Sequence, residues 1–252
     1  MVIKNSSHPE IIRGFIDPTE EDIQQAMQGT ELEREWFSDV PGFETNADIL
    51  TAYEAGKLVK IGESANYRPI GRFLNPELHG TYPPFLPFAA HALLEVVSER
   101  WRQQANKLGV PEDVRLAITS MTRSIAYQRN LVAGGKLAVE DSSHTKVIFG
   151  AVDADLGGYY QGFGDDVTAV SLREPNLQAP ISRLFTTELG ATPAHPRLLG
   201  PAGFDPRVPE ALLLATAEIY DIGAMNRLEE FAGTDNSCLH MVPHPDFMDF
   251  AA

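Results

Sequence analysis

The longest regular pattern in the sequence is an apolar stripe between residues 87 and 108. Its members recur at the spacing of one helix face: Ala90, Leu93, Leu94, Val97, Trp101 and Leu108. Gly109 follows as a helix stop signal. A stripe of this width has to be covered by other elements, so it predicts a core helix around which the rest of the chain packs.

Several shorter patterns predict strands and helices around this core helix. Strands are predicted at residues 114–120, 146–152, 224–230 and 237–242. Further helices are predicted at residues 124–132 and from Pro209 to the stop signal at Gly223, and a glycine-rich turn at 157–158. The order shows no regular βαβ rhythm, which favours an α+β fold with a small, mainly antiparallel sheet and flanking helices.

The length and composition predict one main domain. With 252 residues, 43% of them hydrophobic, the chain can bury a substantial core, and it contains no internal repeat or low-complexity tract. Residues 86–252 are expected to form this domain, with residues 1–85 as an irregular N-terminal extension packed on it. Within the extension, the proline-rich and aromatic stretch at 67–87 is expected to be a loop.

The charge of the chain limits its partners. A formal net charge of -15 and a pI near 4.8 argue against binding to nucleic acid or to anionic lipid. The single cysteine, Cys238, excludes an intrachain disulfide. No stretch approaches the roughly 18 apolar residues of a membrane span, and no apolar signal segment is visible at the start. We therefore expect a cytoplasmic protein, or an exported one if a signal has been removed, and the sequence carries no indication of oligomeric state.

Three short polar motifs follow one another between residues 114 and 243, about half of the chain. The first contains Ser120, Arg123 and Gln128, the second contains Ser143, His144 and Asp153, and the third ends at His240. Their order and separation resemble those of the zinc D-Ala-D-Ala carboxypeptidases and dipeptidases, which share the hedgehog/DD-peptidase fold. The chain is similar to a divergent member of that family.

The resemblance implies a Zn²⁺ ion held by His144, Asp153 and His240. Two imidazoles and one carboxylate leave a fourth position open, as a catalytic zinc site requires. Zinc lowers the pKa of a water molecule and polarises an amide carbonyl, which suits peptide hydrolysis. By resemblance the substrate is a short peptide, D-alanyl or otherwise derived from the cell wall, and a soluble one if the protein is cytoplasmic.

The same resemblance gives roles to the residues of the first two motifs. Arg123 corresponds to the family arginine beside the reacting carbonyl, where a guanidinium stabilises an oxyanion or grips a carboxylate. Ser120, Gln128 and Ser143 are the implied substrate-binding residues. The alternative role for Arg123 is a structural salt bridge in an acidic protein.

The general base departs from the family pattern. The family has a glutamate shortly before the last histidine, but position 237 is a serine here. A hairpin between residues 229 and 240 would place a more distant glutamate across from His240, because alternate residues of a strand face opposite sides. We expect Glu230 as the base, with Glu229 and then Asp235 as alternatives, and an inactive homologue if none of them serves.

The spacing of the metal ligands also departs from the pattern. Nine positions separate His144 from Asp153, more than in the family. An insertion or bulge would absorb the difference. Asp155 is a possible substitute ligand, since it shares a strand face with Asp153.

Two other functions fit parts of the sequence. A catalytically inactive zinc-binding module that recognises peptides or a partner would explain the missing glutamate at position 237. The Asp153-Ala-Asp155 strand end also looks like that of a Mg²⁺-dependent phosphohydrolase, although the βαβ units of such enzymes are not predicted downstream.

Overall fold

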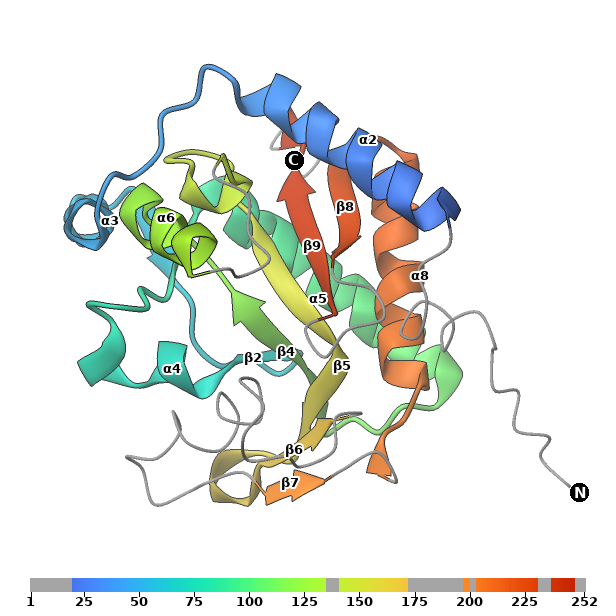
Figure 1. Ribbon diagram of the computed structural model, residues 1–252. Helices are drawn as coiled ribbons and strands as arrows, with labels where there is room; N and C mark the ends of the chain where they lie inside the picture. The colour runs from blue at the N-terminus through green and yellow to red at the C-terminus, as the bar shows by residue number, and fades with distance from the viewer. Residues whose placement is uncertain (1–19, 135–140, 172–196, 200–202, 231–236, 248–252) are drawn as a thin grey trace, which may run out of the picture.

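The computed structural model describes residues 20–134, 141–171, 197–199, 203–230 and 237–247. Helices pack on a sheet whose strands are mostly antiparallel, so the predicted α+β class is confirmed (Figure 1).

The main sheet is built around a long central strand, β5. Its strands are β2 (Tyr67–Pro69), β4 (Val114–Ser120), β5 (Val152–Gln161), β6 (Thr168–Ser171), β7 (Arg197–Leu199), β8 (Met225–Glu230) and β9 (Cys238–Pro243). Strand β5 runs antiparallel to β4, β6 and β9, and β8 pairs antiparallel with β9. The β2–β4 and β6–β7 pairs are parallel. The first half of β5 therefore lies between β4 and β9.

The core helix predicted from the apolar stripe is α5 (Phe88–Leu108). Its stripe residues Leu93, Leu94, Val97 and Trp101 are buried, and Gly109 ends the helix in the left-handed conformation with φ 76°. In Figure 1, α5 lies behind the sheet with α8 (Arg207–Asp221) beside it. The other elements are α2 (Glu20–Phe37), α3 (Asn46–Glu54), α4 (Gly71–Leu74), α6 (Ile125–Ala133), and the paired strands β1 (Leu58–Lys60) and β3 (Phe85–Pro87).

Trp101 joins α5 to α8. Its side chain has no exposed surface, and its indole Nε1 donates a hydrogen bond to the Val208 carbonyl at 3.1 Å. We expect Trp101→Ala to lower the free energy of unfolding by about 3–5 kcal/mol, because a large cavity remains and the carbonyl loses its partner. Urea unfolding would measure this. The exposed neighbour Glu99 is the control, and equal losses for Trp101→Ala and Glu99→Ala would contradict the assignment.

Three local predictions are wrong. Residues 146–152 do not form a strand, because Phe149 and Gly150 have φ values of 66° and 68° and turn the chain before β5 begins. The glycines at 157–158 continue β5 instead of turning, since Gly158 pairs with Ser171 of β6. On the β4 side they lie in an irregularity of the register between Leu116 and Ile118. The segment 67–87, expected to be a loop, contains β2, α4 and β3.

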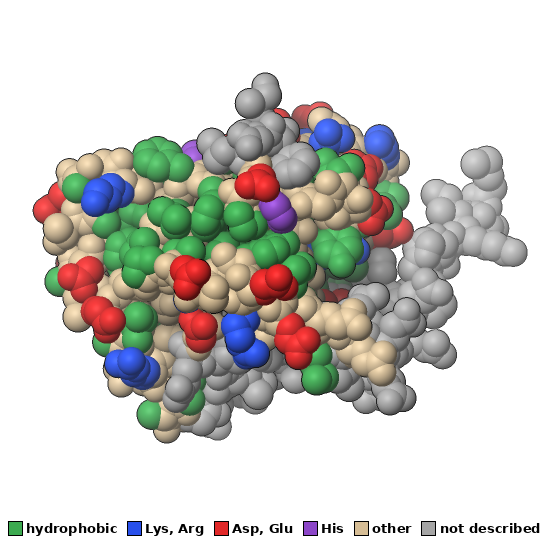
Figure 2. Space-filling model, turned by 90° about the horizontal axis from the view of Figure 1, so that it is seen from above, with side chains coloured by type: hydrophobic (Ala, Val, Ile, Leu, Met, Phe, Trp, Pro, Cys, Tyr) green, Lys and Arg blue, Asp and Glu red, His purple; other side chains and the backbone are tan. Residues whose placement is uncertain are grey.

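Helix α2 lies across the end of the sheet formed by β8 and β9 (Figure 1). Gly29 allows the close approach, because a side chain at this position would collide with Leu228 of β8. The molecule seen from this side has acidic side chains around a central apolar area (Figure 2), in agreement with the negative net charge. None of the helices in the described part of the chain is both long enough and apolar enough to cross a membrane.

Candidate metal centre

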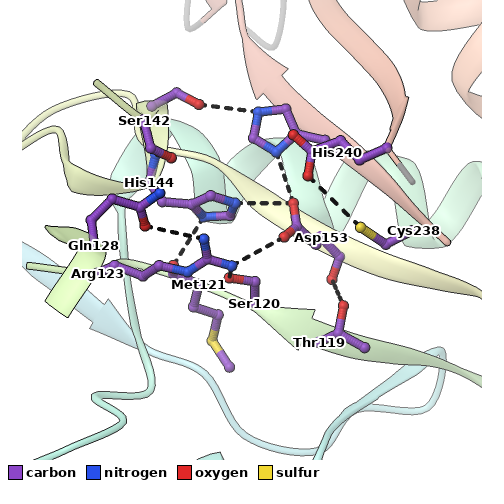
Figure 3. Close-up of polar contacts among 12 residues, drawn as sticks. Thr119, Ser120, Met121, Arg123, Gln128, Ser142, His144, Asp153, Cys238 and His240 are labelled. Atoms are coloured by element: carbon purple, nitrogen blue, oxygen red, sulfur yellow. Dashed lines mark hydrogen bonds and ion pairs between the residues drawn. The ribbon is translucent and has the colours of Figure 1, made fainter. Parts of the chain in front are cut away.

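Three buried side chains meet where β5 and β9 pair. Asp153 at the start of β5 is directly opposite His240 of β9, and His144 comes from a short 3-10 turn at Ser143–Thr145. The Asp153 carboxylate oxygen Oδ1 lies 3.0 Å from His144 Nε2 and 2.8 Å from His240 Nδ1 (Figure 3). One donor atom from each residue lies within 4.8 Å of the other two, so the group could hold a metal ion.

The local structure explains how the longer spacing is accommodated. Ser142 caps the turn that carries His144. The segment after it turns through Phe149, whose ring stacks on Phe37 of α2 at a centroid distance of 5.6 Å. This detour uses the additional residues before Asp153. Asp155 is two residues further along β5 and accepts a hydrogen bond from the Gly157 amide at 2.8 Å. The groups of converging donor atoms found among the described residues do not include Asp155.

The outward nitrogen of each imidazole has a polar partner. His144 Nδ1 lies 3.0 Å from the Met121 carbonyl oxygen, which can only accept, so Nδ1 donates and Nε2 keeps its lone pair. His240 Nε2 lies 3.2 Å from Glu33 Oε2 and 3.0 Å from Ser143 Oγ. Hydrogen bonds of this kind fix the ring orientation of metal-binding histidines. The donor set and its surroundings therefore fit a metal ion.

Burial and charge give the two histidines different protonation behaviour. Burial lowers the pKa of His144 to about 4, so its imidazole is neutral near pH 7. For His240, burial alone would lower the pKa, but the charges of Glu33 and Glu230 raise it well above its usual value. A cation between the two rings and Asp153 would replace the proton that His240 otherwise holds.

The register of β8 on β9 separates the two candidate glutamates. Leu228 is opposite His240 and Glu230 is opposite Cys238, whereas Glu229 is opposite Leu239. Side chains alternate along a strand, so Glu230 faces the same side as His240 and Glu229 faces the other side. Glu230 Oε2 lies 4.0 Å from Cys238 Sγ, and donor atoms of Glu230, Cys238 and Asp153 lie within 4.8 Å of one another. Asp235 lies outside the described residues.

The environment of Glu230 suits proton transfer. Burial raises the pKa of this carboxyl, and the negative charge of Asp153 raises it further against the opposing effect of His240. A carboxyl whose pKa is closer to neutrality transfers protons more effectively in both directions near pH 7.

Arg123 lies beside Oδ2 of Asp153, whereas the two histidines face the other carboxylate oxygen, Oδ1. Its Nη2 atom is 3.6 Å from Asp153 Oδ2 and contacts the Ser120 hydroxyl, and its Nη1 atom is 3.3 Å from Gln128 Oε1 (Figure 3). Ser120 and Gln128, predicted to bind substrate, therefore contact Arg123. The Arg123 side chain is 22% exposed, in contrast to the buried Asp153.

A cavity of about 290 Å³ opens on the site from the side of α2. His240, Glu230 and Ser143 line it together with Glu33. Glu33 is not predicted from the sequence, because this residue lies in the N-terminal segment that the resemblance does not cover. An acidic residue on a charged helix also has no distinguishing pattern.

Comparisons of the chain with protein-family models, with curated proteins and with solved structures find no match.

Proposed function

We propose that the protein is a zinc-dependent peptidase that hydrolyses a short peptide, with D-alanyl or other cell-wall-derived peptides as the substrate class. One observation carries the proposal: His144 Nε2, Asp153 Oδ1 and His240 Nδ1 converge in a buried site, while the outward nitrogens of both rings have partners. Zinc bonds of about 2.0–2.1 Å in a tetrahedral site separate ligand atoms by about 3.3 Å. The contacts of 2.8 and 3.0 Å to Asp153 are close to this separation.

The remaining residues supply the functions that amide hydrolysis needs. A zinc ion held by these ligands would activate water and polarise the substrate carbonyl. Glu230, on the face of His240, takes a proton from the attacking water and returns it to the leaving amine. Arg123, across Asp153 from Glu230, stabilises negative charge on the carbonyl oxygen, and its contacts with Ser120 and Gln128 hold its guanidinium in place.

The donor set favours zinc over the metal of the alternative phosphohydrolase. Mg²⁺ prefers oxygen ligands, whereas two imidazoles and one carboxylate suit zinc and other transition metals. Strand β5 is also antiparallel to β4, β6 and β9, unlike a strand in a parallel βαβ unit. The inactive binding module remains the second candidate because Ser237 stands where the family has its glutamate.

Metal content and hydrolysis together test the proposal. We expect purified protein to contain about one zinc per chain by elemental mass spectrometry and to release D-alanine from D-alanyl-D-alanine. The activity should be lost with a chelator and restored by zinc. Zinc without hydrolysis of D-alanyl-D-alanine or of a longer D-alanyl peptide would favour the binding module. Protein that takes up no zinc would refute the peptidase.

The role of Arg123 gives a further prediction. We expect Arg123→Lys to lower kcat/KM about 10²–10³-fold with zinc content unchanged, since an ammonium group cannot make the same planar contacts with Ser120 and Gln128. The exposed Arg100 on α5 is the control site. Wild-type kcat/KM in Arg123→Lys would mean that Arg123 is only a structural partner of Asp153.

A further inference from the structure

Glu33 joins the N-terminal helix α2 to the candidate metal centre. Glu33 is 9% exposed, and its Oε2 atom lies 3.2 Å from His240 Nε2. The other carboxylate oxygen, Oε1, accepts a hydrogen bond from Asn226 Nδ2 at 2.7 Å. The hydrogen bond from Asn226 therefore holds in place the carboxylate that contacts His240.

The chemistry of this contact determines which ring nitrogen carries a proton. An ionised carboxylate only accepts hydrogen bonds, so the nitrogen that faces Glu33 has to be Nε2–H. The second neighbour of Nε2, the Ser143 hydroxyl at 3.0 Å, can donate or accept and so does not select a tautomer. Asp153 Oδ1 faces Nδ1 in the same way at 2.8 Å, so a cation bound at Nδ1 would displace the proton there. Glu33 then keeps the remaining proton on Nε2.

We infer that Glu33 is a positioning residue that holds His240 with its proton on Nε2 and thereby presents the Nδ1 lone pair to the metal. This inference rests on the metal centre of the proposed function. Glu33 is not a second candidate for the general base, because it faces the edge of the imidazole opposite to Nδ1. Glu230, in contrast, has its carboxylate close to Asp153 on the ligand side.

The support of Glu33 makes the packing of α2 part of the metal site. The Asn226 amide on β8 donates both to Glu33 and to the Gly29 carbonyl at 3.1 Å, one helical turn earlier on α2. Gly29 permits this approach because any side chain there would meet Leu228. The N-terminal segment thus contributes a residue to the site in addition to covering it.

Two variants of Glu33 test the inference. Glu33→Gln keeps the size of the side chain but loses the charge, and Glu33→Ala removes the acceptor. We expect zinc affinity, measured by competition with a chromophoric chelator, to fall about 10–100-fold, with Glu33→Ala at the upper end. Glu35→Gln and Glu35→Ala, at an exposed position of the same helix, should bind zinc as the wild type does.

A second readout separates positioning from general destabilisation. Long-range ¹H–¹⁵N spectra of the zinc-loaded protein should show His240 bound through Nδ1 with a proton on Nε2 in the wild type, and a loss of this single state in Glu33→Ala. Wild-type zinc affinity in both Glu33 variants, or coordination through Nε2 in the wild type, would overturn the inference while leaving the proposed function intact. Wild-type protein that binds no zinc would overturn both.

Discussion

Glu230→Gln is expected to retain one zinc per chain and to lower kcat by about 10²–10⁴-fold. The substitution preserves the shape of the side chain but removes the group that accepts a proton, which accounts for an effect of this size in general base catalysis. Zinc content should not change, because Glu230 is not among the His144, Asp153 and His240 donor group. Hydrolysis of D-alanyl-D-alanine and elemental analysis on the same sample would measure both quantities.

The adjacent residue provides a matched control. Glu229→Gln makes the same chemical change one position away on β8, but its side chain faces the opposite side of the strand. Its kcat should stay within about twofold of wild type, because this half-buried side chain points away from the candidate site. Loss of activity in Glu229→Gln with full activity in Glu230→Gln would show that the base has been assigned to the wrong residue.

The pH dependence of the wild type gives an independent check on the same group. Burial raises the pKa of Glu230 above its usual value of 4.5. Glu230 has to be ionised to accept a proton, so kcat should fall as the pH drops through this raised pKa. Glu230→Asp, which retains a carboxylate in a different position, should keep some activity and move this acid limb.

The second large effect is the loss of zinc binding expected when one of the proposed metal ligands is removed. His144→Ala and His240→Ala should each abolish stoichiometric zinc binding, because either change leaves only two of the three converging donors. His91→Ala is the control, since His91 lies on α5 and contacts Glu95 outside the site. Zinc at about one per chain in His144→Ala, after dialysis against a weak chelator, would contradict the ligand assignment.

The parts of the fold that the sequence predicts well are those determined by local pattern. The stripe that ends at Gly109 predicts α5 to within one residue at its start, and the alternation at 114–120 predicts β4 with its observed bounds. The strand predicted at 146–152 is not formed, because Phe149 has a positive φ that no sequence pattern indicates. The turn predicted at 157–158 is absent because the pairing of Gly158 with Ser171 of β6 keeps the strand continuous, and the glycines produce only a shift of register against β4.

The residues of the candidate site also fall into those that the sequence predicts and those that only the structure identifies. The order of the polar motifs was sufficient to name His144, Asp153 and His240 as a group, and the structure brings their donor atoms together. The choice between Glu229 and Glu230 needed the observed register of β8 on β9, because a shift of one residue exchanges the faces. Glu33 could not be predicted, since its contact with His240 joins positions 207 residues apart.

The packing of α2 against β8 and the pairing of β5 with β9 have a consequence during synthesis on the ribosome. Glu33 of α2 is made 193 positions before its partner Asn226 and 207 positions before His240. The nascent protein therefore cannot bring the candidate metal ligands together, or pack α2 on β8, until β8 and β9 have left the exit tunnel. Contacts of such high sequence separation form slowly, so the candidate site is expected to be among the last parts of the fold to form.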